Sequence, residues 1–172
     1  MEITTDAISF RDPLKGNILG SDAWLLGEIE LDALTPGRSD LVLKIEDLAF
    51  EPRVRSILPP SLQKAWDSCS PSGRFGLQVS GGGDTFPPTL DELRLTLTGA
   101  DASSSHYPYP LRNLVGELRF FGDSIELDIS GGASGEPIRF RGRFETIPDG
   151  RMHLVMEGKS LPLDDRIRTA LG

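Results

Sequence analysis

The chain of 172 residues has little cysteine, little histidine and no excess of basic residues. One Cys and two His exclude an internal disulfide and a Cys-rich zinc site. Lys plus Arg number 18 against 26 Asp plus Glu, and a net charge of −8 argues against nucleic-acid binding, which needs a surplus of cations. No apolar run reaches the roughly 18 residues of a membrane-spanning helix. We therefore expect no metal, no other cofactor and no nucleic acid.

Apolar and polar residues alternate along most of the chain, and this alternation predicts β-strands. Successive strand side chains point to opposite faces, so a two-residue period gives each strand one apolar and one polar face. This pattern is typical of antiparallel sheets that are half exposed to water. Nine strands are expected, at 4–10, 23–31, 39–46, 74–80, 93–98, 118–120, 125–129, 138–144 and 152–156. Hairpin turns are predicted at 121–124 and 147–150, and longer polar loops at 80–84 and 99–106.

Helix is expected in one connector and at the end of the sequence. Pro52 suits the first turn of a helix, because the N–H that proline lacks has no partner there. Pro59 and Pro60 interrupt the helical pattern, which resumes with apolar residues at helical spacing. The connector therefore covers 51–68, and a further helix is predicted to start at Asp164.

An internal repeat links two distant parts of the chain. Segments 37–58 and 150–171 align without a gap at an offset of 113, with eight identities in 22 positions. Each copy reads as a strand, a short linker and the start of a helix that carries Arg-x-Arg. We expect the chain to be a piece of a longer repeat protein. Its expected parts are the end of one unit with about three strands (1–50), a full unit with the connector and about six strands (51–163), and the start of the next unit's helix (164–172).

Several phrases in these segments resemble a known family. Residues 107–118, YPYPLRNLVGEL, are similar to the aromatic-Pro-aromatic-Pro-Leu and Val-x-Gly phrase of AsmA-like and TamB-like bacterial envelope proteins. Residues 161–171 and 58–66 resemble the helix-opening phrases between their repeats. The order of these phrases covers about 47–171, and the chain lacks the membrane anchor of a complete member.

The resemblance implies a fold, a function and a location. The fold would be mainly β, an antiparallel curled sheet open like a trough, with one or two short helices between repeats. Family members are anchored in the inner membrane, extend through the periplasm and hold phospholipid acyl chains for lipid transport and outer-membrane biogenesis. The partners implied are phospholipid or another acyl-chain lipid and neighbouring repeats of the parent chain. The membrane anchor would lie outside this sequence.

The expected lipid-facing surface consists of the apolar residues of the alternating strands. They are Phe75, Leu77, Val79, Leu93, Leu95, Leu97, Leu118, Phe120, Ile125, Leu127, Ile129, Ile138, Phe140, Leu154 and Met156. Alternation by itself fits a closed β-sandwich equally well. The alternative is therefore an extracytoplasmic interaction module with a closed β core that binds protein or glycan.

Catalytic motifs do not emerge from the sequence. The Gly-rich stretch 81–83 and the Ser72-Gly73 pair match neither a phosphate-binding loop nor a nucleophile elbow. Most acidic residues alternate with apolar ones, which places them on the solvent face of a strand rather than in a cleft. We therefore expect no enzymatic activity.

Overall fold

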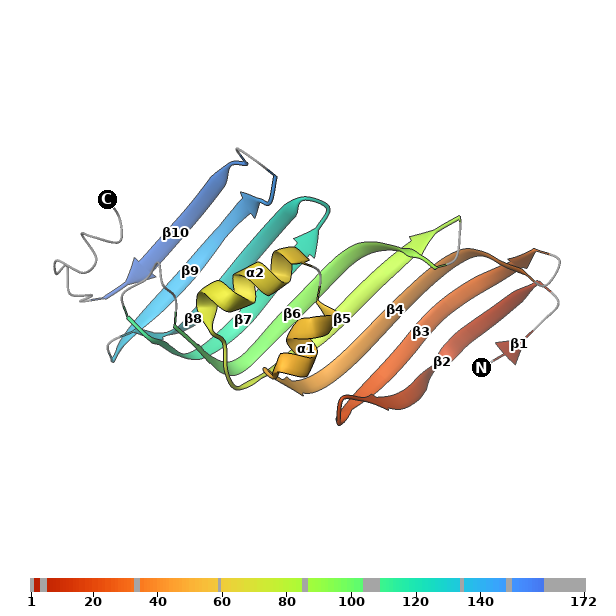
Figure 1. Ribbon diagram of the computed structural model, residues 1–172, viewed down its shortest axis with the longest axis horizontal. Coiled ribbons are helices and arrows are strands. Elements are labelled where there is room, and N and C mark those ends of the chain that lie inside the picture. Colours follow the sequence, from red (N-terminus) through yellow and green to blue (C-terminus); the bar gives the residue numbers. More distant parts are fainter. Residues whose placement is uncertain are drawn as a thin grey trace. The chain divides into compact units, whose positions relative to one another are not determined.

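The computed structural model describes residues 2–3, 6–32, 35–58, 60–84, 87–103, 109–133, 135–147 and 150–159. These residues form ten strands and two short helices (Figure 1). The strands are β1 (Glu2–Ile3), β2 (Ala7–Ile18), β3 (Ser21–Asp32), β4 (Thr35–Ala49), β5 (Arg74–Gly83), β6 (Thr89–Ala102), β7 (Leu111–Phe121), β8 (Ser124–Ala133), β9 (Glu136–Glu145) and β10 (Met152–Gly158). The helices are α1 (Pro52–Ile57) and α2 (Pro60–Cys69).

The strands form one antiparallel sheet in which spatial order follows chain order, from β1 to β10. Among the described residues the first and last strands are not neighbours, so the sheet is open. The expected mainly β fold with two short helices is confirmed. The closed β-sandwich, which would need a second sheet against the first, is wrong.

Internal contacts divide the chain into two units. The first unit contains residues 1–48, 76–95 and 119–122, and the second contains 49–75, 96–118 and 123–172. The units group strand segments that lie together rather than consecutive residues, whereas the expected boundaries at 50 and 163 follow the sequence repeat and stay a prediction. The expected helix at 164–172 lies outside the described residues.

The two helices occupy the connector that the sequence predicts, and an aromatic cluster attaches them to the sheet of the second unit. Phe50, just before α1, contacts Trp66 of α2 edge-on, with 5.1 Å between ring centroids. Its other neighbour is Phe75 of β5, at 4.3 Å. Arg55 of α1 donates two hydrogen bonds to the Asp67 carboxylate of α2, at 2.7 and 2.6 Å. The aromatic packing fixes the connector to the sheet, and the exposed ion pair joins its two helices.

Several strands extend beyond the ranges that alternation predicts, and for two of them the structure shows a local cause. β2 continues to Ile18 instead of ending at residue 10, and its register shifts between Phe10 and Leu14. That irregularity, which contains Pro13, breaks the two-residue period and hides the second half of the strand. β5 continues through Gly83 into the segment expected to be a loop. A Cβ on Gly81 would lie 2.5 Å from the Thr89 carbonyl oxygen, so these glycines permit close backbone packing rather than a loop.

The other predicted loop, 99–106, is also partly strand. β6 runs to Ala102, because Asp101 exchanges two backbone hydrogen bonds of 2.9 Å with Ser72. The predicted turn between Phe121 and Ser124 is confirmed, since β7 ends and β8 begins at these two residues.

Candidate functional site

One face of β8, β9 and β10 in the second unit is built from three rows of apolar residues and glycine. Strand register sets these rows, because residues paired across an antiparallel ladder share a face. The rows are Ile125–Phe144–Met152, Leu127–Gly142–Leu154 and Ile129–Phe140–Met156. We call this surface the apolar face of β8–β10. At two residues per row and about 3.4 Å per residue, it extends about 14 Å along the strands from the first row to the last.

Exposure increases across this face towards the edge strand. Ile125 of β8 is 5% exposed, whereas Leu154 and Met156 of β10 are 46% and 39% exposed. At one end of the face Ile138 packs with Tyr109 and Ala133 in a small buried cluster, and Phe140 lies against that cluster. The apolar face of β8–β10 is therefore well packed on β8 and around Ile138, and exposed on the edge strand β10.

The structure brings together seven of the fifteen predicted lipid-facing residues on this face. They are Ile125, Leu127, Ile129, Ile138, Phe140, Leu154 and Met156. Phe144 and Met152 complete the rows and were missed by the sequence reasoning, although each continues the alternation of a predicted strand.

The other predicted residues belong to strands β5, β6 and β7 and are more deeply covered. Phe75, Leu77, Leu93 and Leu97 are buried, and Phe75 is fully enclosed where it meets Phe50. The remaining members are partly buried: Val79, Leu95, Leu118 and Phe120.

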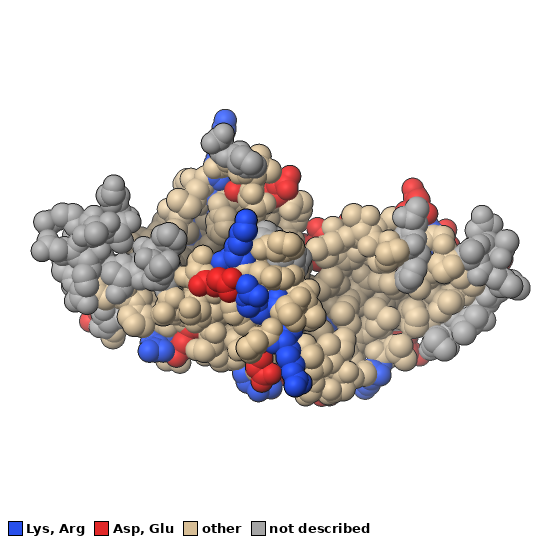
Figure 2. All heavy atoms as spheres, viewed as in Figure 1, with Lys and Arg blue, Asp and Glu red and all other residues tan. Residues whose placement is uncertain are grey.

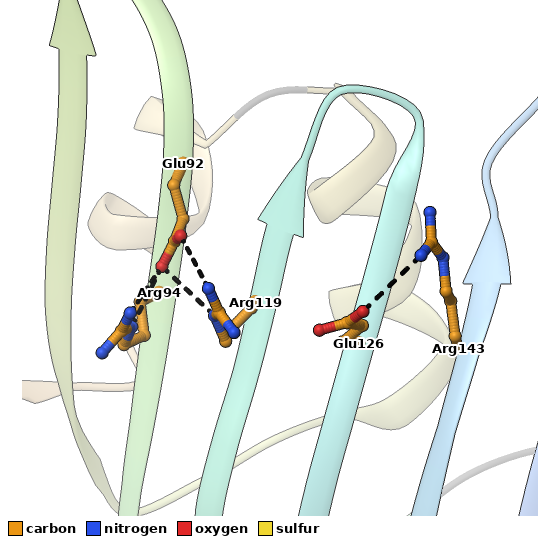
Figure 3. Close-up of polar contacts among 5 residues, drawn as sticks. All are labelled: Glu92, Arg94, Arg119, Glu126 and Arg143. Atoms are coloured by element: carbon orange, nitrogen blue, oxygen red, sulfur yellow. Dashed lines mark hydrogen bonds and ion pairs between the residues drawn. The ribbon is translucent and has the colours of Figure 1, made fainter.

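The opposite face of β8–β10 is charged, and its charges are paired. Asp128 accepts two hydrogen bonds from Arg139, at 2.9 and 2.7 Å, and this contact lowers the pKa of the Asp128 carboxyl. Arg141 donates to Glu157 at 2.7 Å. Arg143 lies 3.7 Å from Glu126 (Figure 3). Three arginines of β9 thus alternate with its apolar residues and meet three acids from β8 and β10.

A second polar cluster lies in the first unit. Glu92 of β6 accepts hydrogen bonds from Arg94 on its own strand and from Arg119 of β7 (Figure 3). Hydrogen bonding from Arg119, and then from Arg94, lowers the pKa of the Glu92 carboxyl despite an opposing desolvation effect. Glu92 and Arg94 are the polar half of the alternation in β6 and lie on the face opposite Leu93 and Leu95.

The first unit has its own apolar face, formed by β2, β3 and β4. Ladder pairs place Leu14 opposite Leu25, Leu25 opposite Leu43, and Ala23 opposite Ile45. Where the view of Figure 2 passes over these strands, the surface is almost entirely uncharged, and charged atoms lie at its margin. These residues were not among the predicted site residues, although the alternation in 39–46 was visible in the sequence.

Neither a metal-binding group nor a membrane-spanning helix is present among the residues that the structure describes. The described residues contain no group of three or more His, Cys, Asp or Glu side chains that could hold a metal ion. None of their helices is long and apolar enough to cross a membrane. Tyr109 is buried in the cluster with Ala133 and Ile138. Trp66 anchors α2 through Phe50.

The described residues thus form an open antiparallel sheet, and its strands β8–β10 have one apolar face and one face of paired charges. No protein-family model matches the chain, and comparison with curated proteins and with solved structures likewise finds no match.

Proposed function

We propose that this chain is a non-catalytic segment of a repeat-built bacterial envelope protein, whose apolar sheet face holds the acyl chains of phospholipids. The observation that carries this proposal is the segregation of side chains on β8–β10. One face consists of three rows without a charged or hydrogen-bonding side chain, and the other holds paired Arg, Asp and Glu.

The chemistry of the three rows favours an acyl chain over a polar ligand. Their side chains are those of Ile, Leu, Phe and Met, and none can direct a hydrogen bond to a ligand. Binding would then come from burial, at about 0.8 kcal/mol for each methylene removed from water. Such a surface selects for the length of the apolar chain and is indifferent to the lipid headgroup.

The exposed margin of the face supports a removable occupant. Leu154 and Met156 are 46% and 39% exposed, whereas Leu41 and Leu43, at the equivalent positions of β4, are partly buried. Contiguous exposed apolar surface on a protein marks a place where a partner or ligand binds. Gly142, in the middle row, adds no side chain to the centre of the face.

The wider role follows from the resemblance to AsmA-like and TamB-like proteins. In that role the parent protein is anchored in the inner membrane and located in the periplasm. It carries lipid between membranes during outer-membrane biogenesis, and this chain forms one stretch of its lipid-holding surface. No catalytic step is assigned to the chain.

Two adjacent residues of β10 provide a matched test. Met156 lies on the apolar face and Val155 on the opposite face, and both are 39% exposed. Met156→Asp and Val155→Asp therefore add the same charge at equal exposure, one residue apart. Placing a carboxylate against an acyl chain costs about 1–3 kcal/mol, so Met156→Asp should weaken binding roughly 5- to 150-fold.

The assay is titration with a fluorescent fatty acid, together with native mass spectrometry of phospholipid that co-purifies with the protein. We expect the wild type and Val155→Asp to bind alike, with both variants retaining the circular dichroism of the wild type. Equal affinity of the two variants, or a wild-type chain that binds no acyl chain, would contradict the proposal.

A further inference from the structure

Two hairpins of the chain, β3–β4 and β9–β10, share a geometry that extends the sequence repeat into three dimensions. The offset of 113 residues places Asp40 and Leu41 of β4 at His153 and Leu154 of β10. Each hairpin has a glycine opposite these residues: Gly27 pairs with Leu41, and Gly142 pairs with Leu154.

The backbones approach closely at both glycines. A Cβ on Gly27 would overlap the Asp40 carbonyl oxygen and lie 2.9 Å from the Leu41 Cα. A Cβ on Gly142 would overlap the His153 carbonyl oxygen and lie 2.9 Å from the Leu154 Cα. Gly27 and Gly142 thus approach backbone atoms that lie 113 residues apart, although Gly142 lies outside the repeat detected by sequence. Gly116 of β7 approaches Asp128 and Ile129 of β8 in a similar way, so the equivalence of β4 and β10 rests on the aligned sequence repeat, with which the two glycines agree.

The second edge of β4 is occupied, and a specific contact shows how. β5 follows β4 in the sheet order. A Cβ on Gly82 of β5 would lie 3.1 Å from the Ser39 carbonyl oxygen and 3.9 Å from the Asp40 Cα. The glycine-rich end of β5 therefore lies directly beside this part of β4, in the first unit.

The corresponding edge of β10 is open among the described residues, since β10 ends the sheet order. All seven residues of β10 are exposed, whereas Leu41 and Leu43 of β4 are partly buried and Ile45 is buried. The position equivalent to Ser39, which is 3% exposed, is Met152, which is 74% exposed. An open strand edge presents unpaired N–H and C=O groups that can pair with a further strand.

We infer that the free edge of β10 is a docking site for an extended strand of the β5 type, supplied by an adjoining repeat. Such a strand alternates aliphatic and polar residues and ends in glycines. It would pair antiparallel to β10, as neighbouring strands do throughout this sheet, with its glycines beside Met152 and His153. Backbone hydrogen bonds give affinity in this mode, and the alternating side chains continue the apolar and polar faces of the sheet. The inference rests on strand equivalence and on the repeat-built part of the proposed function, and it does not depend on lipid binding.

A synthetic peptide with the sequence of residues 74–83 serves as the probe, added to the full chain in lipid-free buffer. We expect amide hydrogen exchange in β10 to slow at least tenfold, at alternate residues only, because alternate N–H groups face the free edge. A nitroxide spin label at the peptide's C-terminus should broaden signals near Met152 rather than near Gly158. The control peptide carries Asp in place of Phe75, Leu77 and Val79 and should give no protection.

Two proline variants test whether the edge itself binds. Val155 and Met156 are adjacent, so the N–H of one faces β9 and that of the other faces the open edge. The variant at the open edge, either Val155→Pro or Met156→Pro, should leave β9 signals unchanged and weaken peptide binding at least tenfold. The inference is overturned if the peptide gives no saturable protection of β10, if the label broadens the Gly158 end, or if both folded proline variants bind like the wild type.

Discussion

Gly27 is the position where the close packing of two strands can be tested most sharply. Its φ of 125° lies in a region that side chains other than glycine rarely adopt. A Cβ there would also overlap the carbonyl oxygen of Asp40 on the neighbouring strand. Gly27→Ala therefore combines backbone strain with a clash against backbone atoms, which cannot rotate away as a flexible side chain could.

The expected cost follows from these two effects. Holding an L-residue in such a conformation costs on the order of 1–3 kcal/mol. Forcing packed backbone apart adds about 1–3 kcal/mol. The variant should thus lose roughly 2–6 kcal/mol of unfolding free energy, which for a chain of this size lowers the melting temperature by roughly 4–24 °C.

Gly16 provides the matched control. It lies in β2, where an added Cβ would meet nothing within 4 Å, and its φ is not in the left-handed region. Gly16→Ala should be neutral or stabilising by about 0.4–1 kcal/mol, because alanine restricts the unfolded chain. Thermal melts followed by circular dichroism compare the two variants with the wild type. Melting of Gly27→Ala within 2 °C of Gly16→Ala would refute the close approach of β3 and β4.

Three further predictions concern the core, the ion pairs and the single thiol. Phe75→Ala should destabilise the chain by about 3–5 kcal/mol, measured by urea unfolding, because the ring is fully buried against Phe50; a loss below 1 kcal/mol would place Phe75 outside the core. The pKa values of Asp128, Asp101 and Glu92 are lowered by hydrogen bonding, mainly from Arg139, the Asn113 N–H and Arg119 respectively. These lowered pKa values stabilise the fold fully above the unfolded pKa of about 4, and the stabilisation is lost as pH falls through the lower pKa values of the folded state. Urea unfolding midpoints should therefore decrease from about pH 5 downwards, and less steeply in Arg139→Gln than in the wild type. Parallel pH profiles for that variant and the wild type would count against the Asp128–Arg139 ion pair. Burial raises the pKa of the Cys69 thiol, so at pH 8 it should react with iodoacetamide several-fold more slowly in the native chain than in urea, and equal rates would contradict this.

Alternation was sufficient to locate strands but not all of their ends. Each of the nine expected strands has a counterpart among β2 to β10, because a sheet that buries one face requires a two-residue period. The predicted end of β2 was wrong because the backbone departs from that period at the irregularity between Phe10 and Leu14. The loop predicted at Gly81 and Gly82 was also wrong, because these glycines permit close contact between strands instead of a turn.

The sequence predicted which side of each strand is apolar, but not which of these apolar residues other segments bury. Alternation placed Ile129, Phe140 and Met156 on the apolar side of their strands, and the register joins them in one row. The same pattern assigned Phe75 to that class, yet Phe50 and the connector bury it. Coverage depends on which distant segments pack over a strand, and a two-residue period carries no such information.

The central claim is that an acyl chain lies on the apolar face of β8–β10, and paramagnetic broadening of methyl signals tests it most directly. The probe is a fatty acid with a nitroxide label near the end of its chain, added to protein with labelled Leu, Ile and Val methyl groups. We expect the methyl signals of Leu127, Ile129 and Leu154 to broaden strongly and that of Val155, on the opposite face, to broaden less. Equal broadening of Val155 and Leu154, or saturable binding that broadens none of these methyl signals, would contradict it.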